Sequence, residues 1–180
     1  MRREEAGELA RNRGFSNWGF FPAEKLRFLT EVRDMCVADR CGKFGKTWTC
    51  PPACGTLEEI TGRARAYSWG ILLQTTGQME DAFDAETLVD AMEKQKENFR
   101  AYVEGIRKDY PGEDILPMSS GGCDLCAACT YPEEACRFPE QAVPSMEAYG
   151  LLVTEVCELA GIPYYYGKNT ITFSSCVLFH

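Results

Sequence analysis

Apolar side chains recur along the chain at spacings that predict both helices and strands. The longest helical pattern covers residues 85–108, where apolar side chains return every three or four positions. Thr56 and Glu59 form a Thr-x-x-Glu capping box, which predicts the start of a short helix. In chain order the pattern predicts a helix over 22–35, a helix over 57–65, a strand over 67–75, a helix over 85–108, a strand over 114–118, a helix over 146–160 and a terminal β-hairpin over 164–179.

Three stretches fall outside this pattern. Residues 15–21 are aromatic and contain glycine, and we predict a loop that docks onto another part of the molecule. Residues 36–55 and 121–139 have no useful periodicity and contain several Gly and Pro, which predicts irregular loops. We therefore predict an α/β (α+β) fold, in which a mixed β-sheet is covered by helices and carries two cysteine-rich metal-binding loops, within a single domain over residues 1–180.

Eight of the ten cysteines lie in these two loops. The first quartet is spaced C-x4-C-x8-C-x3-C and comprises Cys36, Cys41, Cys50 and Cys54. The second is spaced C-x2-C-x2-C-x6-C and comprises Cys123, Cys126, Cys129 and Cys136. A chain of this length can build an ordinary core without disulfide staples, so cysteine quartets are interpreted as metal ligands.

The second quartet favours an iron–sulfur cluster. Three cysteines at successive three-residue steps wrap a loop around one small object, and the inward backbone amides of such a loop can donate hydrogen bonds to cluster sulfides. Bacterial ferredoxins use a similar C-x2-C-x2-C-x3-C-P run, whereas here the last gap is longer and Arg137 follows the final cysteine. We predict two [4Fe–4S] clusters, one per quartet, with the exact grouping of the eight ligands left open.

Zinc is the alternative metal. Structural zinc sites often draw their four ligands from two separated C-x2-C knuckles, and neither quartet contains such a pair. The first quartet is less decisive, because its C-x3-C element and its wider gaps suit either metal. The single histidine, His180, leaves sulfur as the expected ligand, and sulfur suits clusters and soft metals.

Other residues in and beyond the loops allow two interpretations each. Arg40, Lys43 and Lys46 either offset thiolate charge or belong to a solvated loop, and Trp48 either shields a site from water or simply packs. Cys157 lies on an apolar helical face, which predicts a core residue. Cys176 lies on the more polar face of the last predicted strand, where core packing is favoured over a ligand or a reactive thiol.

The charge of the chain limits its partners. A net charge of −8 suits neither nucleic acid nor an anionic membrane surface, because both require clustered Lys and Arg. The N-terminal residues are charged and open no signal peptide, and no run reaches the ~18 apolar residues of a membrane helix. We expect a cytoplasmic protein without nucleic-acid or membrane partners, and a reducing compartment favours metal ligands over disulfides.

The residues around the quartets resemble a known family. The matching features are Cys41-Gly42, the run WTCPPAC from Trp48 to Cys54, the run CDLCAAC from Cys123 to Cys129, and the stretch from Cys136 to Gly150. They resemble the bacterial and archaeal predicted metal-binding proteins, a cysteine-rich domain of unknown function. The resemblance implies metal binding through these cysteines and supplies no established reaction.

Three functions are compatible with these observations. In the first, two clusters relay single electrons to a redox protein partner, and the acidic surface helps docking onto a basic one. In the second, the protein is an enzyme, and one cluster has an open iron position that binds substrate. In the third, zinc stabilises an interaction module without a redox role.

Overall fold

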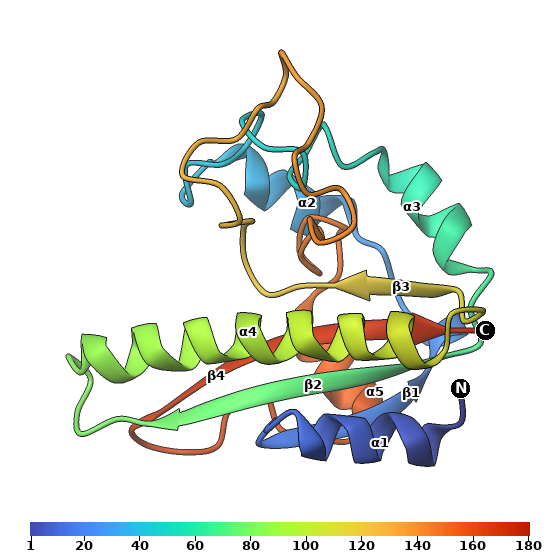
Figure 1. Cartoon of the computed structure of the whole chain (residues 1–180). Helices are drawn as coiled ribbons and strands as arrows, with labels where there is room; N and C mark the ends of the chain where they lie inside the picture. Colours follow the sequence, from blue (N-terminus) through green and yellow to red (C-terminus); the bar gives the residue numbers. More distant parts are fainter.

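The computed structural model describes all residues, 1–180, and is built on a four-stranded sheet (Figure 1). The strands lie in the order β1-β2-β4-β3. Their bounds are Asn17–Pro22 for β1, Trp69–Gln78 for β2, Ile115–Met118 for β3 and Thr170–Phe179 for β4. The α+β class is confirmed, and all three strand pairings are antiparallel, so the sheet is not mixed.

The two long strands, β2 and β4, form the centre of the sheet. Trp69 lies opposite Phe179 at one end of their pairing, and Gln78 lies opposite Thr170 at the other. Because successive side chains of a strand point to opposite faces of the sheet, neighbouring residues pack into hydrophobic clusters on opposite faces. Leu72 belongs to the core cluster on one face, whereas the adjacent Ile71 and Leu73 belong to the cluster on the other.

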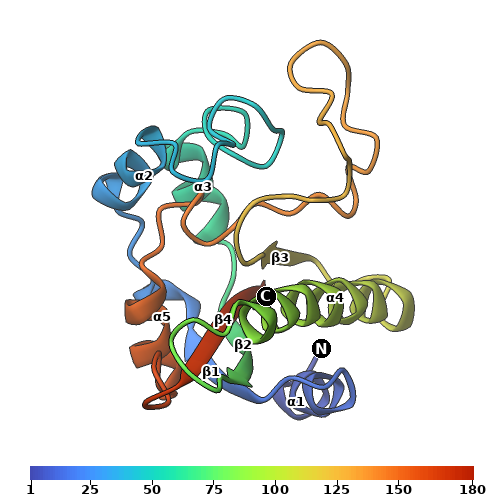
Figure 2. The same cartoon turned by 90° about the vertical axis from the view of Figure 1, so that its left-hand side faces the viewer.

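Helices cover both faces of the sheet. The helices α1 (Arg3–Asn12) and α4 (Ala85–Asp109) pack on one face, and α5 (Val153–Ala160) packs on the other (Figures 1 and 2). The hydroxyl of Tyr102, a fully buried α4 residue, donates a hydrogen bond of 3.1 Å to the Ala6 carbonyl of α1. The face of the sheet under α4 therefore has a core of its own, which contains no cysteine.

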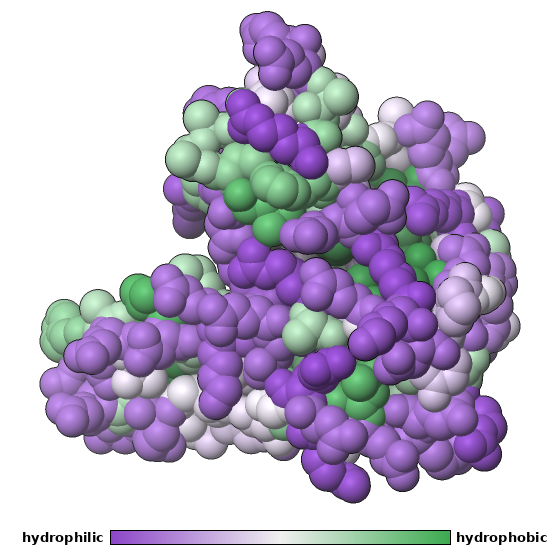
Figure 3. Space-filling view, viewed as in Figure 1, coloured by the Kyte–Doolittle hydropathy of each residue, from purple (hydrophilic) through white to green (hydrophobic).

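The cysteine loops lie together beyond the β3 edge of the sheet, with α2 (Thr30–Val37) and α3 (Leu57–Ala64) beside them (Figures 1 and 2). An isolated bridge between Ser119 and Ser145 connects the two ends of the second loop region. In Figure 3 the outer side of α4 is hydrophilic, whereas hydrophobic residues gather on the loops above it. We call this part of the molecule, residues 26–66 and 119–152, the cysteine lobe.

Several predicted elements are confirmed. The predicted helix 57–65 is α3, and the Thr56 hydroxyl accepts a hydrogen bond of 3.2 Å from the Glu59 N–H while the Glu59 carboxylate accepts one from the Thr56 N–H. The long predicted helix is α4, and β2 and β3 lie within a few residues of the predicted strands.

The N-terminal predictions are wrong in two places. Residues 15–21 are not a docking loop, because the segment forms β1 and pairs with β2, with Phe21 fully buried. The helix predicted over 22–35 begins only at Thr30, since Pro22 ends β1 and Ala23–Lys25 form a 3-10 turn, η1. The helix α1 was not predicted, because its charged sequence has no apolar periodicity. It packs through the small residues Ala6 and Ala10.

Two C-terminal predictions also require correction. In the predicted helix 146–160 only α5, Val153–Ala160, is helical, because the turn that follows Ser145 ends at Gly150 in a left-handed conformation with φ of +83°. The predicted hairpin 164–179 contains a single strand, β4, whose partners are β2 and β3. The segment before β4 forms no strand. It is fixed by a hydrogen bond of 2.7 Å that the Tyr166 hydroxyl donates to the Gln74 side chain.

Candidate metal centres

The four cysteines of the second quartet line one pocket. Cys123, Cys126, Cys129 and Cys136 all face a space of about 370 Å³, which includes open solvent, and most of the residues around it are apolar. The loop that carries them has no helix or strand of its own. Local side-chain contacts hold its shape, since the Arg137 guanidinium donates a hydrogen bond of 3.0 Å to the Ala128 carbonyl.

The first cysteine loop forms a wall of this same pocket. Thr47, Trp48 and Thr49 lie among its lining residues. The Trp48 indole N–H donates a hydrogen bond of 3.1 Å to the Glu134 carbonyl, and its ring meets that of Tyr131 edge-on, with centroids 4.9 Å apart. Trp48 thus packs between the two loops, as the packing interpretation predicts, and the shielding interpretation stays a prediction.

Two hydroxyl groups in this wall are buried without a hydrogen-bond partner. Thr47 is 8% exposed and Thr49 is 3% exposed, and neither Oγ1 atom has a partner. A third threonine of the pocket differs, because the Thr130 hydroxyl donates a hydrogen bond of 2.9 Å to the Ala135 carbonyl. Buried hydroxyls normally find partners, so the two orphaned groups mark a place that accepts a hydrogen bond from them.

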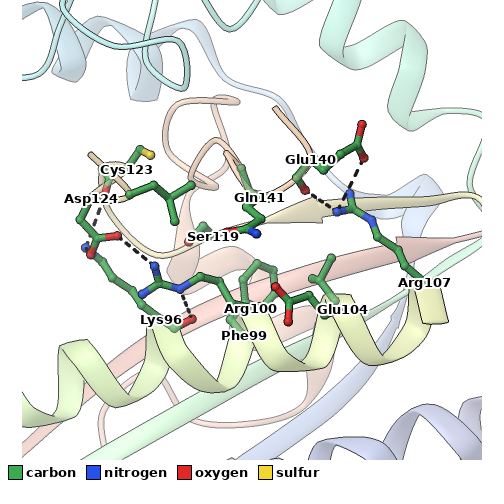
Figure 4. A pocket seen from close by; sticks show the side chains of 14 residues that line it. Lys96, Phe99, Arg100, Glu104, Arg107, Ser119, Cys123, Asp124, Glu140 and Gln141 are labelled. Carbon is green, nitrogen blue, oxygen red and sulfur yellow. Dashed lines mark hydrogen bonds and ion pairs between the residues drawn. The ribbon is translucent and has the colours of Figure 1, made fainter. Parts of the chain in front are cut away.

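Cations hold the backbone on both sides of Cys123. Lys96 of α4 donates hydrogen bonds to the Gly122 carbonyl, at 3.3 Å, and to the Asp124 carboxylate, at 2.7 Å (Figure 4). The Lys43 ammonium of the first loop donates to the Cys123 carbonyl. Burial raises the pKa of the Cys123 thiol, while the Leu125 N–H acts in the opposite direction. This cysteine is therefore fixed from α4 and from the first loop at once.

A small cavity of about 40 Å³ lies between α4 and the second cysteine loop (Figure 4). Phe99 and Val103 of α4 line it, and its charged lining includes Glu104. Cys123 and Leu125 belong to this cavity and to the cysteine pocket alike, so the two spaces are neighbours.

Three cysteines of the first quartet line two separate cavities, and Cys50 lines neither. Cys36, in the last turn of α2, and the exposed Cys41 line a cavity of about 300 Å³, whereas Cys54 lines another of about 130 Å³. Cys50 is buried, and its backbone carbonyl accepts a hydrogen bond of 3.1 Å from the Cys54 N–H. Burial raises the pKa of the Cys36 thiol, and the nearby thiols of Cys41 and Cys50 act in the same direction.

Arg33 supplies positive charge to the first quartet. One of its terminal nitrogens donates a hydrogen bond of 2.7 Å to the Gly55 carbonyl, and the other, Nη1, is buried without a partner. Burial raises the pKa of the Cys54 thiol to about 11, and the charge of Arg33 opposes this effect. Arg40 lies in the cavity of Cys36, whereas Lys46 forms an ion pair of 2.9 Å with Asp39.

The donor set fits a group bound through sulfur. Each loop contributes four thiols, and each quartet has buried hydrogen-bond donors without a partner nearby: Arg33 of α2 at the first quartet, and Thr47 and Thr49 of the first loop at the second quartet. In this structure no three Cys, His, Asp or Glu side chains are grouped closely enough to hold a metal ion. Cys157 and Cys176 stand apart, 1% and 0% exposed in the core under α5, so the core interpretation of both holds.

Sequence reasoning missed Arg33, Thr47, Thr49 and Lys96. Arg33 lies three residues before Cys36 on a helix, a spacing that places the two side chains on one face. This three-residue spacing was the sequence signal that could have placed Arg33 beside the first quartet. The threonines and Lys96 gave none, because their positions at the second quartet depend on contacts between segments distant in the sequence.

Fold and site together define a cysteine-rich α+β protein whose thiols gather in two adjoining loops. The chain belongs to the family described as "Predicted metal-binding protein (DUF2284)", whose model matches residues 19–179. The resemblance that the two quartets indicate is therefore confirmed.

Other comparisons add little. No curated protein matches the sequence. Among solved structures, the chain is similar to epoxyqueuosine reductase from Streptococcus thermophilus, with 13% identity and a TM-score of 0.47 over 98% of this chain and 45% of that one. The chain thus spans less than half of that structure, and at this TM-score the likeness carries no argument. None of the helices is long and apolar enough to cross a bilayer.

Proposed function

We propose that this protein binds two iron–sulfur clusters of the [4Fe–4S] type, one at each cysteine quartet, and serves electron transfer or an accessory redox role. The observation that carries the proposal is the pocket that Cys123, Cys126, Cys129 and Cys136 line together. Membership of a metal-binding family supports it at the coarser level of metal binding. When bound, such a cluster supplies a one-electron redox couple.

The residues around each quartet suit this role. Arg33 and Lys43 bring positive charge to the quartets, which offsets the negative charge of thiolate ligands. Trp48 lines the second pocket and packs edge-on against Tyr131, and restricted solvent access is one of the factors that set a cluster potential. The contact between the two loops brings the two quartets into one lobe, as a relay between them requires.

The acidic chain favours a redox protein partner with a basic docking surface. The net charge of −8 would attract such a partner over distance and orient it on approach. We expect no role for nucleic acid.

The test is metal analysis of the full chain purified without oxygen. We expect a brown protein with about eight irons and as many sulfides, following the rule of four cysteines per cluster. Cys126→Ala should lose about half of the iron, and Cys50→Ala should do the same at the other quartet. Cys157→Ala and Cys176→Ala are the matched controls, because these cysteines lie in the core, and they should keep the full iron content. A colourless protein with stoichiometric zinc would contradict the proposal and support the zinc-stabilised module.

The cavity beside Cys123 favours a second candidate function, that of a redox enzyme acting on a small molecule. It adjoins the cysteine pocket through Cys123 and Leu125. Its lining places the cations Lys96, Arg100 and Arg107 beside apolar side chains. An enzyme of this kind would hold its substrate at an iron with an open coordination position. Cyanide is a suitable probe: a changed paramagnetic resonance spectrum of the reduced protein would support the enzyme, and an unchanged one would favour four thiolate ligands.

A further inference from the structure

Three threonines line the pocket of the second quartet, and they are not equivalent. The Thr130 hydroxyl is satisfied within its own loop by the Ala135 carbonyl. Thr47 and Thr49 belong to the first loop, and both residues are more than nine-tenths buried. Neither hydroxyl has a hydrogen-bond partner. Both residues line the pocket, and they belong to the segment that leads into Cys50.

A threonine hydroxyl carries one proton to donate, and burial removes water as its acceptor. The polar groups that this pocket offers in addition to backbone are chiefly the four cysteine sulfurs. Thiolate sulfur is a negatively charged acceptor, and hydrogen bonds to charged groups are the stronger ones. In this structure neither hydroxyl reaches a cysteine sulfur, and thiolates that hold a bound group would be the strongest acceptors that the pocket offers.

We propose that Thr47 and Thr49 donate hydrogen bonds to sulfur at the second quartet, so that the first cysteine loop supplies part of the binding site of the second centre. This inference rests on the proposed function, because it requires a sulfur-ligated cofactor in that pocket. It adds two positioning and tuning residues that lie in a different loop from the ligands. It also couples the two centres, since Thr49 is followed directly by Cys50 of the first quartet.

The expected effect is on the reduction potential. Reduction adds negative charge, and a hydrogen bond to sulfur stabilises the more negative state, so a donor raises the potential. Thr47→Val and Thr49→Val keep the size and shape of the side chain and remove the donor. Each should lower the midpoint potential of the second centre, and the double variant should lower it further.

The experiment is a redox titration of the anaerobically loaded full chain, followed by paramagnetic resonance. The signal of the second centre is the one that Cys126→Ala removes. Thr47→Ser and Thr49→Ser retain a hydroxyl and should keep a potential close to the wild-type value. Thr75→Val is the matched control, because Thr75 is 3% exposed with an unpartnered hydroxyl but lies in β2, outside the cysteine lobe. It should leave the potential unchanged.

Loaded Thr47→Val and Thr49→Val proteins with the wild-type potential would overturn the inference. If a valine variant fails to fold, the corresponding alanine variant removes the same hydroxyl from a smaller side chain and provides the same test. The two proposals fail in different ways. A wild-type chain without iron and sulfide would overturn the proposed function, whereas a loaded chain with unshifted variants would overturn only the role of the hydroxyls.

Discussion

The ten cysteines differ in their surroundings more than in their chemistry. Cys157 and Cys176 are 1% and 0% exposed, and burial raises the pKa of both, to about 11 for Cys157, so they stay neutral thiols at physiological pH. The expectation that Cys176 lies on a polar strand face is wrong, because the residue packs in the core cluster with Leu72 and Met118. The quartet cysteines lie nearer the surface, apart from Cys50.

Arg33 offers a test of charge at the first quartet. Arg33→Met removes the guanidinium and should lower the midpoint potential of that centre, because positive charge stabilises the reduced, more negative state. A charge at the edge of a partly buried site is worth on the order of 1.4 kcal/mol, or about 60 mV for one electron. A redox titration measures this shift. Arg33→Lys keeps the charge and should stay close to wild type, and an equal potential in the Arg33→Met protein would contradict the assignment.

At the scale of elements, β1 and α5 approach more closely than side chains allow. A Cβ atom on Gly19 of β1 would lie 2.2 Å from the carbonyl oxygen of Ala160, at the end of α5. Backbone cannot move aside as a flexible side chain can. Glycine is therefore required at this position by the packing of the helix on the strand.

Gly19→Ala should consequently destabilise the protein by about 2–3 kcal/mol, the upper part of the range for an overpacked core. Urea denaturation followed by circular dichroism measures the change in the free energy of unfolding. The matched control is Gly62→Ala in α3, where a Cβ atom meets nothing within 4 Å. That variant should gain about 0.5–1 kcal/mol from helix propensity. A Gly19→Ala protein as stable as wild type would show that α5 shifts freely on β1.

The whole molecule divides into a sheet with its helices and a cysteine lobe. The core under α4 contains Tyr102 and Phe99 and no cysteine at all. The loops 36–55 and 121–139, by contrast, have no regular structure apart from the end of α2, and their shape depends on side-chain contacts and on whatever the thiols bind.

Removal of the metal should therefore affect the two parts differently. After chelation we expect the far-ultraviolet circular dichroism of α4 and the sheet to persist, while trypsin gains access to Lys43 and Arg137 in the cysteine loops. Loaded protein should resist cleavage there, because binding orders the loops. Lys96 and Arg100, within α4, are the internal controls and should resist trypsin in both states. Loss of most of the helical signal on chelation would mean that the sheet does not fold independently of the metal.

Local sequence patterns predicted the α+β class, α3, α4, the approximate positions of β2 and β3, and the assignment of the chain to a metal-binding family. These follow from local causes: a capping box, a long helical periodicity, an apolar strand, and cysteine spacing within a single loop. The strand β1 was not predicted because Gly19, a residue depleted in strands, stands in the middle of it, and α1 was not predicted because it is buried through small residues such as Ala6.

The assembly of the cysteine lobe depends on tertiary contacts, which the sequence pattern does not reveal. Thr47 and Trp48 of one loop close the pocket of the other, and Lys96 reaches that loop from α4. These contacts join segments far apart in the chain, and no local pattern encodes them. The spacing of the cysteines identifies candidate ligands, whereas the tertiary contacts determine which hydroxyls and cations surround them and hence how a bound centre would be tuned.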